Sequence, residues 1–129
     1  MNTKYLMIAS SIFMGLPGLS ATFLPNEILN YVGLNSSVLS TLLIQITGAL
    51  YVGFGLMNWM AKTVLIGGIY SKPLCMGNFL HFTVAALALI KAAFKHLDVK
   101  FILIAAIAYS IFAILFGLVL FTSPKQTNR

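Results

Sequence analysis

The sequence predicts an all-α integral membrane protein, an up-down bundle of four helices that forms one domain over residues 1–129 with both termini in the cytoplasm. The first observation is composition: 60% of the 129 residues are hydrophobic and only 8% are charged, whereas soluble domains have about 25% charged residues. The second is a mean hydropathy of +0.97. The third is the presence of four apolar segments, each near the roughly 20 residues that cross a bilayer core as a helix.

The four segments cover about residues 5–24, 39–60, 74–93 and 101–121. Backbone N–H and C=O groups find no water in lipid, so each segment is expected to be helical. The connections are short, and neighbouring helices are therefore expected to run antiparallel. For the first segment the alternative is a cleavable signal peptide, because Lys4 precedes it and small residues lie at 18–20. The apolar stretch is long for a signal core, which favours the membrane span.

The connections carry signals of their own. In the first, PNEILNYVGLNSS at residues 25–37, residues 28–32 are amphipathic enough for a short interfacial helix. Ser36 or Ser37 is placed to cap the helix that follows. The second, AKTVLIGGIYSKP at residues 61–73, has two interpretations. Either the preceding helix extends to about Ile66 and breaks at the next two glycines, or the segment is re-entrant.

The basic residues predict the orientation in the membrane. Five lie on the side of the two termini (Lys4, Lys62, Lys72, Lys125 and Arg129) and three lie on the other side (Lys91, Lys95 and Lys100). The positive-inside rule then predicts cytoplasmic termini, although a difference this small leaves insertion in both orientations as an alternative. The expected location is the cell inner membrane, as a multi-pass protein. The net charge of +6 comes from scattered residues. We therefore expect contact with anionic headgroups of the lipid bilayer and no binding of nucleic acid.

Small residues recur at steps of three and four in every span, which is how membrane helices approach one another closely. The candidates for helix packing are Gly48, Gly55, Ala85, Ala88, Ser110 and Gly117. The polar intramembrane candidates are Gln45, Asn58, Asn78 and His81. Because Asn78 and His81 share one face with the alanines of their span, they are expected to point towards other helices. The expected partner of His81 is Asn58, Tyr109 or a backbone carbonyl.

An ionisable residue inside a span is a functional candidate, but the surroundings of His81 favour packing. Glu27 and Asp98 are the only acidic residues, and both fall in connections. Cys75 is the single cysteine, which excludes an intrachain disulfide. His96 lies in or near a loop, too far along the chain from His81 to share a haem. No metal site, cofactor or catalytic residue is therefore expected, and enzymatic activity is not expected.

Three strings carry a family resemblance: FLPNEIL at the end of the first span, IQITGALYVGFGLMNW in the second and GNFLHF in the third. In these the chain resembles the DoxX-like group of small bacterial membrane proteins. The resemblance implies four spans and a place in the bacterial membrane. It also implies an accessory role, because members of that group are proposed as accessory subunits of membrane redox systems. None of the strings is a catalytic signature, and no residue role is carried over.

These observations favour a small accessory or scaffold subunit that associates with a membrane protein partner or with copies of itself. Two alternatives stay open. The first is an oligomeric channel or carrier for a small solute, with Asn58, Asn78 and His81 at its inward end. The second is a lipid- or quinone-binding module in which His81 donates a hydrogen bond.

Overall fold

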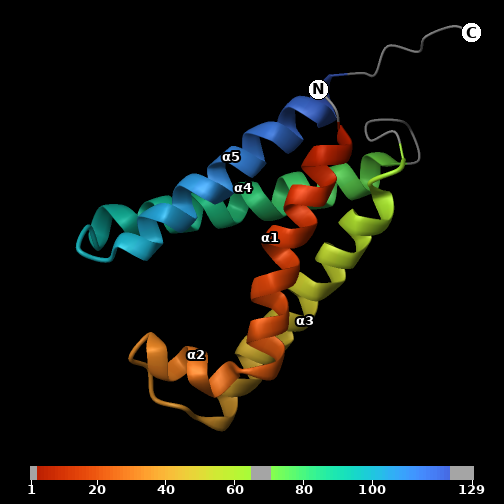
Figure 1. Ribbon diagram of the computed structural model, residues 1–129. Coiled ribbons are helices and arrows are strands. Elements are labelled where there is room, and N and C mark those ends of the chain that lie inside the picture. Colours follow the sequence, from red (N-terminus) through yellow and green to blue (C-terminus); the bar gives the residue numbers. More distant parts are fainter. Residues whose placement is uncertain (1–2, 65–70, 123–129) are drawn as a thin grey trace, which may run out of the picture. The chain divides into compact units, whose positions relative to one another are not determined.

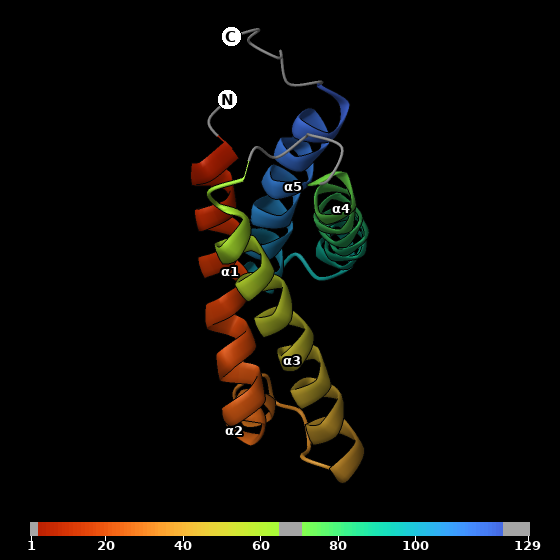
Figure 2. The same ribbon diagram turned by 90° about the vertical axis from the view of Figure 1, so that its right-hand side faces the viewer.

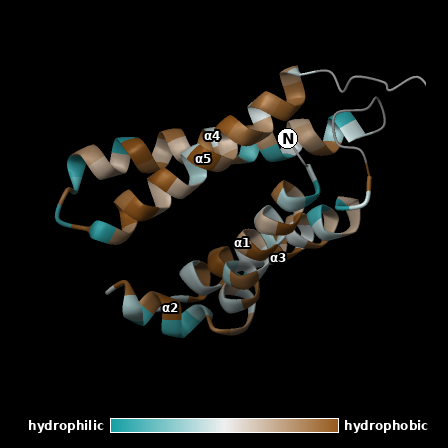
Figure 3. Ribbon diagram, turned by 45° about the horizontal axis from the view of Figure 1, so that its top comes forward, coloured by the Kyte–Doolittle hydropathy of each residue, from teal (hydrophilic) through white to brown (hydrophobic). Residues whose placement is uncertain are grey.

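The computed structural model describes residues 3–64 and 71–122. This part of the chain forms five helices and no strand (Figure 1): α1 (Thr3–Phe23), α2 (Pro25–Tyr31), α3 (Val38–Ala61), α4 (Lys72–Lys95) and α5 (Lys100–Phe121). The four helices other than α2 are long and apolar enough to cross a membrane. Figure 3 shows the hydrophobic residues along them. The prediction of an all-α, multi-pass membrane protein is thereby confirmed.

The chain divides into two compact units, Met1–Thr63 and Val64–Arg129. In the first unit α1 and α3 contact each other along their length, and α2 contacts both. The two long helices lie side by side and antiparallel in both views of the ribbon (Figures 1 and 2). In the second unit α4 and α5 form an antiparallel hairpin, closed by the turn at residues 96–99. Each unit is thus a helical hairpin.

The connection after α1 is a helix of seven residues, as the amphipathic pattern predicts. Pro25 stands at its start, where the missing N–H of proline costs no hydrogen bond. Leu29 is 1% exposed and anchors α2 to the hairpin. The helix ends at Tyr31, and Gly33 follows two residues later with a φ of 74°, which suits glycine. Two backbone bonds, from Gly33 N–H to the Asn30 carbonyl and from Leu34 N–H to the Leu29 carbonyl, complete this turn.

The second long helix begins with a capping box. Ser37 Oγ accepts a hydrogen bond from the Ser40 backbone N–H at 3.1 Å, and Ser40 Oγ accepts one from the Ser37 N–H at 2.8 Å. Of the two serines that the sequence offered, Ser37 is therefore the cap. These two bonds satisfy backbone donors that the first turn of a helix leaves without a partner.

The end of α3 corrects one prediction. The helix stops at Ala61, so its predicted extension to about Ile66 is wrong. Lys62 follows as the C-cap and its Nζ lies 3.2 Å from the centroid of the Trp59 ring, a cation–π contact. An aromatic ring and a cation at a helix end are typical of a membrane interface, which accounts for a stop at this point. The other interpretation, a re-entrant segment, concerns residues 65–70 and lies outside the described residues.

Candidate functional site

The helices α1 and α3 approach each other closely, and glycines permit it. A Cβ built on Gly48 would lie 2.7 Å from the Thr22 backbone nitrogen and 2.8 Å from the Gly18 carbonyl oxygen. A Cβ on Gly18 would lie 2.8 Å from the Val52 backbone nitrogen. At Gly55 the nearest atoms are those of the Gly15 backbone, at 3.1 Å. The small residues of one helix thus face those of the other, and backbone packs on backbone.

Two polar side chains of α3 bind α1 at either end of this contact. Asn58 is fully buried, and its Nδ2 donates a hydrogen bond to Ser10 Oγ at 3.0 Å. Ser10 Oγ in turn donates to the Met7 carbonyl at 3.1 Å. Towards the other end, Gln45 Nε2 donates to the Thr22 carbonyl at 3.5 Å. That carbonyl belongs to the last turn of α1, where carbonyls lack intrahelical donors.

An aromatic cluster fills the contact between α4 and α5. Phe82 and Phe116 are fully buried, and their rings stack with centroids 5.6 Å apart. Phe112 also stacks on Phe82, with ring centroids 4.8 Å apart. Tyr109 is buried as well, with its ring 5.5 Å from that of Phe82. Face-to-face and tilted pairs at these distances attract beyond simple packing.

His81 lies at the edge of this aromatic cluster and is half-buried. Its ring centroid is 5.2 Å from that of Phe82 and 5.9 Å from that of Tyr109. Of the partners expected from the sequence, Tyr109 is therefore a contact of His81. One turn before it, Asn78 is fully buried and donates from Nδ2 to the Leu74 carbonyl at 3.0 Å.

The remaining packing candidates lie on α4 and α5 in a way that differs from the predicted stripe. The buried residues of α4 are Cys75, Asn78, Phe82, Ala86 and Ala93. Ala88 is exposed and Ala85 is half-buried. The alanines that α4 buries in its hairpin are thus Ala86 and Ala93, together with the large ring of Phe82, and not Ala88. Cys75, fully buried, donates from Sγ to the Phe116 carbonyl at 3.6 Å.

On α5, Ser110 and Gly117 are half-buried. Ser110 Oγ donates to the Ala106 carbonyl of its own helix at 2.7 Å, which satisfies the hydroxyl without a second helix. Gly117 faces Phe79: a Cβ on Gly117 would lie 3.1 Å from Phe79 Cε2. Of the two, only Gly117 makes a contact between α4 and α5 that its small size permits.

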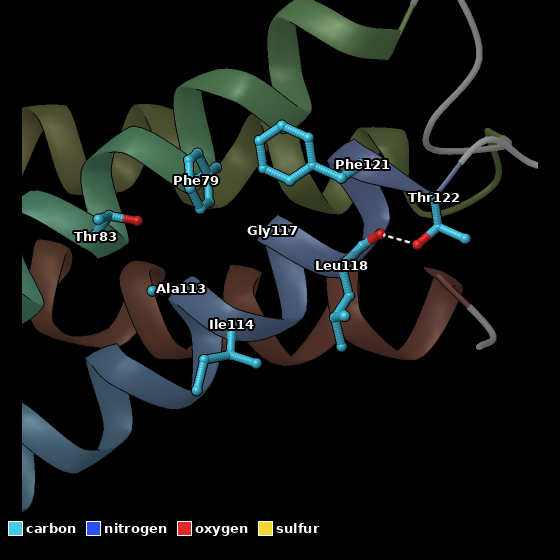
Figure 4. A pocket seen from close by; sticks show the side chains of 8 residues that line it. All are labelled: Phe79, Thr83, Ala113, Ile114, Gly117, Leu118, Phe121 and Thr122. Atoms are coloured by element: carbon cyan, nitrogen blue, oxygen red, sulfur yellow. Dashed lines mark hydrogen bonds between the residues drawn. The ribbon is translucent and has the colours of Figure 1, made fainter.

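Two apolar hollows flank the α4–α5 contact. One, of about 370 Å³, extends from Ile90 and Ala93 to Ser110 and Ile114. The other, of about 420 Å³, lies between Phe79 and Thr83 of α4 and residues 113–122 of α5 (Figure 4). Thr83 Oγ1 is buried there and has no hydrogen-bond partner within the part of the chain that the structure describes. Within residues 3–64 and 71–122, no three His, Cys, Asp or Glu side chains gather as a metal site would require.

Several residues of these contacts are missing from the candidates that the sequence indicated. Ser10 Oγ accepts from Asn58 and the Thr22 backbone carbonyl accepts from Gln45, but neither residue is among those candidates. For Ser10 the signal was polarity alone, since a Ser in a membrane helix usually satisfies its hydroxyl on its own helix; the backbone acceptor of Thr22 gives no signal in the sequence. Phe112 and Phe116 stand one turn apart, a spacing that puts both rings on one face of α5, where both stack on Phe82. No family model, curated protein or solved structure matches this chain.

Proposed function

We propose that this chain is a small inner-membrane protein that acts by association, as an accessory or scaffold subunit. The observation that carries the proposal is the exposed side of α3. Ala49 and Gly53, four residues apart, lie on that side, away from the α1 contact. A Cβ on Gly53 would meet nothing within 4 Å. A pair of small residues at this spacing permits close approach of another membrane helix.

The rest of the exposed side of α3 is apolar and large. Leu42, Leu43, Ile46, Leu50 and Leu56 are each about half exposed or more. Of the 18 residues that form the most apolar stretch of each helix, only 11% are buried in α3, against 33% in α1. Lipid tails can cover such a face as well as a protein helix can, so the exposed leucines alone do not show which of the two lies against α3. The small pair at Ala49 and Gly53 favours a helix.

A co-purification experiment tests the association. The full-length tagged protein is extracted from its native membrane in mild detergent without crosslinking, and its mass and partners are measured. We expect a stoichiometric partner or a homo-oligomer, and Gly53→Leu is expected to abolish it. Ala9→Leu is the matched control, since Ala9 is an exposed small residue of α1. A monomer without partners, or solute flux by the purified protein in liposomes, would contradict the proposal.

We further propose that the two hairpins join in one four-helix bundle with both termini in the cytoplasm. The support is the excess of Lys and Arg on the side of the termini and the short link between α3 and α4. The resemblance to the DoxX-like group agrees with this arrangement. Cysteines placed at residues 2 and 128 are expected to react with a membrane-impermeant thiol reagent only after the cytoplasmic side is opened. Cys75 is fully buried and gives little background.

A second candidate function is supported by the position of His81. Its half-buried ring, next to Tyr109 at the edge of the aromatic cluster, suits a hydrogen bond to a quinone-type ligand. His81→Leu tests this function. If fold, assembly and cellular phenotype survive the substitution, His81 is a packing residue. Loss of phenotype in a variant that folds and assembles normally would favour the quinone-type ligand over the accessory role.

A further inference from the structure

Two hollows meet at the end of the α4–α5 hairpin where α4 begins and α5 ends. The larger is the apolar one between Phe79 and Gly117, of about 420 Å³ (Figure 4). The smaller, of about 330 Å³, is lined by Lys72, Pro73, Met76, Leu120 and Phe121. Phe121 lines both, so the two hollows are neighbours, and we call them together the groove; Lys72 supplies a cation at one end. Both volumes lie within the range of about 300–1,000 Å³ that is usual for small-molecule sites.

Small residues of α5 line the apolar part of the groove. Ala113 and Gly117 occupy positions one turn apart, and Gly117 leaves room for the Phe79 ring, whose Cε2 would lie 3.1 Å from a Cβ at that position. Phe79 and Phe121 form a wall, with their rings in an edge-to-face pair at 5.8 Å. Thr122 satisfies its hydroxyl on the Leu118 carbonyl and offers no free donor towards the groove (Figure 4). The apolar part of the groove therefore presents almost only carbon atoms to a ligand.

The depth of the groove corresponds to one leaflet of a bilayer. Lys72 is the first residue of α4 and stands at the end of a span. Thr83, at the other end of the groove, lies eleven residues further along α4. At 1.5 Å per residue this is about 16 Å, or about half of the roughly 30 Å hydrocarbon core. The apolar part thus extends from the membrane interface to about the bilayer midplane.

The charge at the interface end is positive. Lys72 is exposed, and it stands at the start of a helix, where the helix dipole is also positive and disfavours a cation. An anion bound at this point would interact favourably with both. Lipid phosphates at the surface of an anionic leaflet are such anions.

We propose that this groove binds one anionic phospholipid, with its phosphate on Lys72 and an acyl chain along Phe79, Ala113 and Gly117. The length of the groove, its carbon lining and its single cation match the two parts of such a lipid. This site is separate from the exposed face of α3 on which the proposed association rests. Failure of one proposal therefore leaves the other intact.

Lipid binding to the full-length protein tests the charge. The protein is delipidated in detergent and titrated with phosphatidylglycerol or with phosphatidylcholine of the same chains, and bound lipid is counted by native mass spectrometry. We expect phosphatidylglycerol to bind more tightly, and Lys72→Gln to weaken it about fivefold, towards the phosphatidylcholine value. Lys100→Gln is the matched control, because Lys100 begins α5 as Lys72 begins α4, at the opposite end of the hairpin. Equal effects of the two substitutions, or no effect of Lys72→Gln, would overturn the proposal.

Three further variants test the contacts of the acyl chain of the lipid. Ala113→Leu fills the apolar part and is expected to weaken both lipids, whereas Ala108→Leu, at a position that lines neither hollow, is expected to weaken neither. Thr83→Val is expected to leave binding unchanged or tighter, because an acyl chain offers Thr83 no hydrogen bond. Loss of binding in Thr83→Val would instead indicate a ligand with an acceptor near the midplane, such as a quinone, and would overturn the assignment. Circular dichroism checks that each variant folds. If Ala113→Leu does not fold, the comparison of Lys72→Gln with Lys100→Gln decides the test.

Discussion

A Cβ added to Gly48 would lie 2.7 Å from the backbone nitrogen of Thr22 on the neighbouring helix. Real side chains essentially never approach backbone so closely, so only glycine lets α1 and α3 pack at this distance. In lipid, where apolar surface gains little from burial between helices, such close packing is a main source of attraction. The helix contacts within the two hairpins and the cap of α3 each lead to predictions that can be measured.

Gly48→Ala is expected to force α1 and α3 apart and to cost about 1–3 kcal/mol of stability. The measurement is the midpoint of thermal unfolding of the full-length protein in detergent. Gly15→Ala is the control, because a Cβ at Gly15 meets nothing within 4 Å. Since alanine is the better helix former, Gly15→Ala is expected to be neutral or stabilising. Equal losses at both positions would mean that helix propensity or a different contact, and not the approach of α1 to α3, sets the effect.

The hydrogen bond from Asn58 to Ser10 is expected to show as a coupling in a double-mutant cycle of Asn58→Ala and Ser10→Ala. We expect about 0.6 kcal/mol, the average for hydrogen bonds between membrane helices. Asn58→Ala alone is expected to cost more than the coupling, because it also removes volume from a fully buried position. Unfolding of the four proteins in detergent gives the cycle. Strict additivity of the two substitutions would show that the bond contributes nothing to stability.

Phe82→Ala is expected to destabilise the α4–α5 hairpin by more than about 1 kcal/mol. Phe82 is fully buried and its ring contacts those of Tyr109, Phe112 and Phe116, and each aromatic pair contributes about 0.5–1.5 kcal/mol. Phe94→Ala serves for comparison, because Phe94 on the same helix is 78% exposed. Near-ultraviolet circular dichroism through a thermal scan reports the loss of aromatic packing. The aromatic cluster would lose its structural role if the two variants unfolded at the same temperature.

Ser37→Ala is expected to remove the capping box of α3 and to cost about 1 kcal/mol. Ser36→Ala, one residue earlier and outside the helix, is expected to change stability by less than about 0.5 kcal/mol. Amide hydrogen exchange of the first turn of α3 measures the effect where it arises. Faster exchange of these amides in Ser36→Ala than in Ser37→Ala would show that Ser36, and not Ser37, is the cap.

Much of the first hairpin could be predicted from the sequence. Gly48 and Gly55 stand at a spacing of seven, and Gly18 stands among small residues of the first span; the structure brings these stripes together. Small residues at steps of three and four predict this contact correctly, because α1 and α3 both carry such residues on the faces that meet. The same rule placed Ala85 and Ala88 at a helix contact, whereas the structure leaves Ala88 exposed. On α4 the buried alanines are Ala86 and Ala93 instead, and the ring of Phe82 packs against three rings of α5.

The sequence by itself determined the membrane character, the four spans and a short helix in the first connection, and it limited the cap of α3 to Ser36 or Ser37. These depend on hydropathy, length and local hydrogen bonding, which act along one segment at a time. Only the tertiary structure decided which partner each polar side chain takes, such as Ser10 for Asn58, and which face of α4 is buried. A helix that is apolar on every side has no pattern that marks its inner face. The choice is then made by the fit of side chains on two helices, which neither helix contains alone.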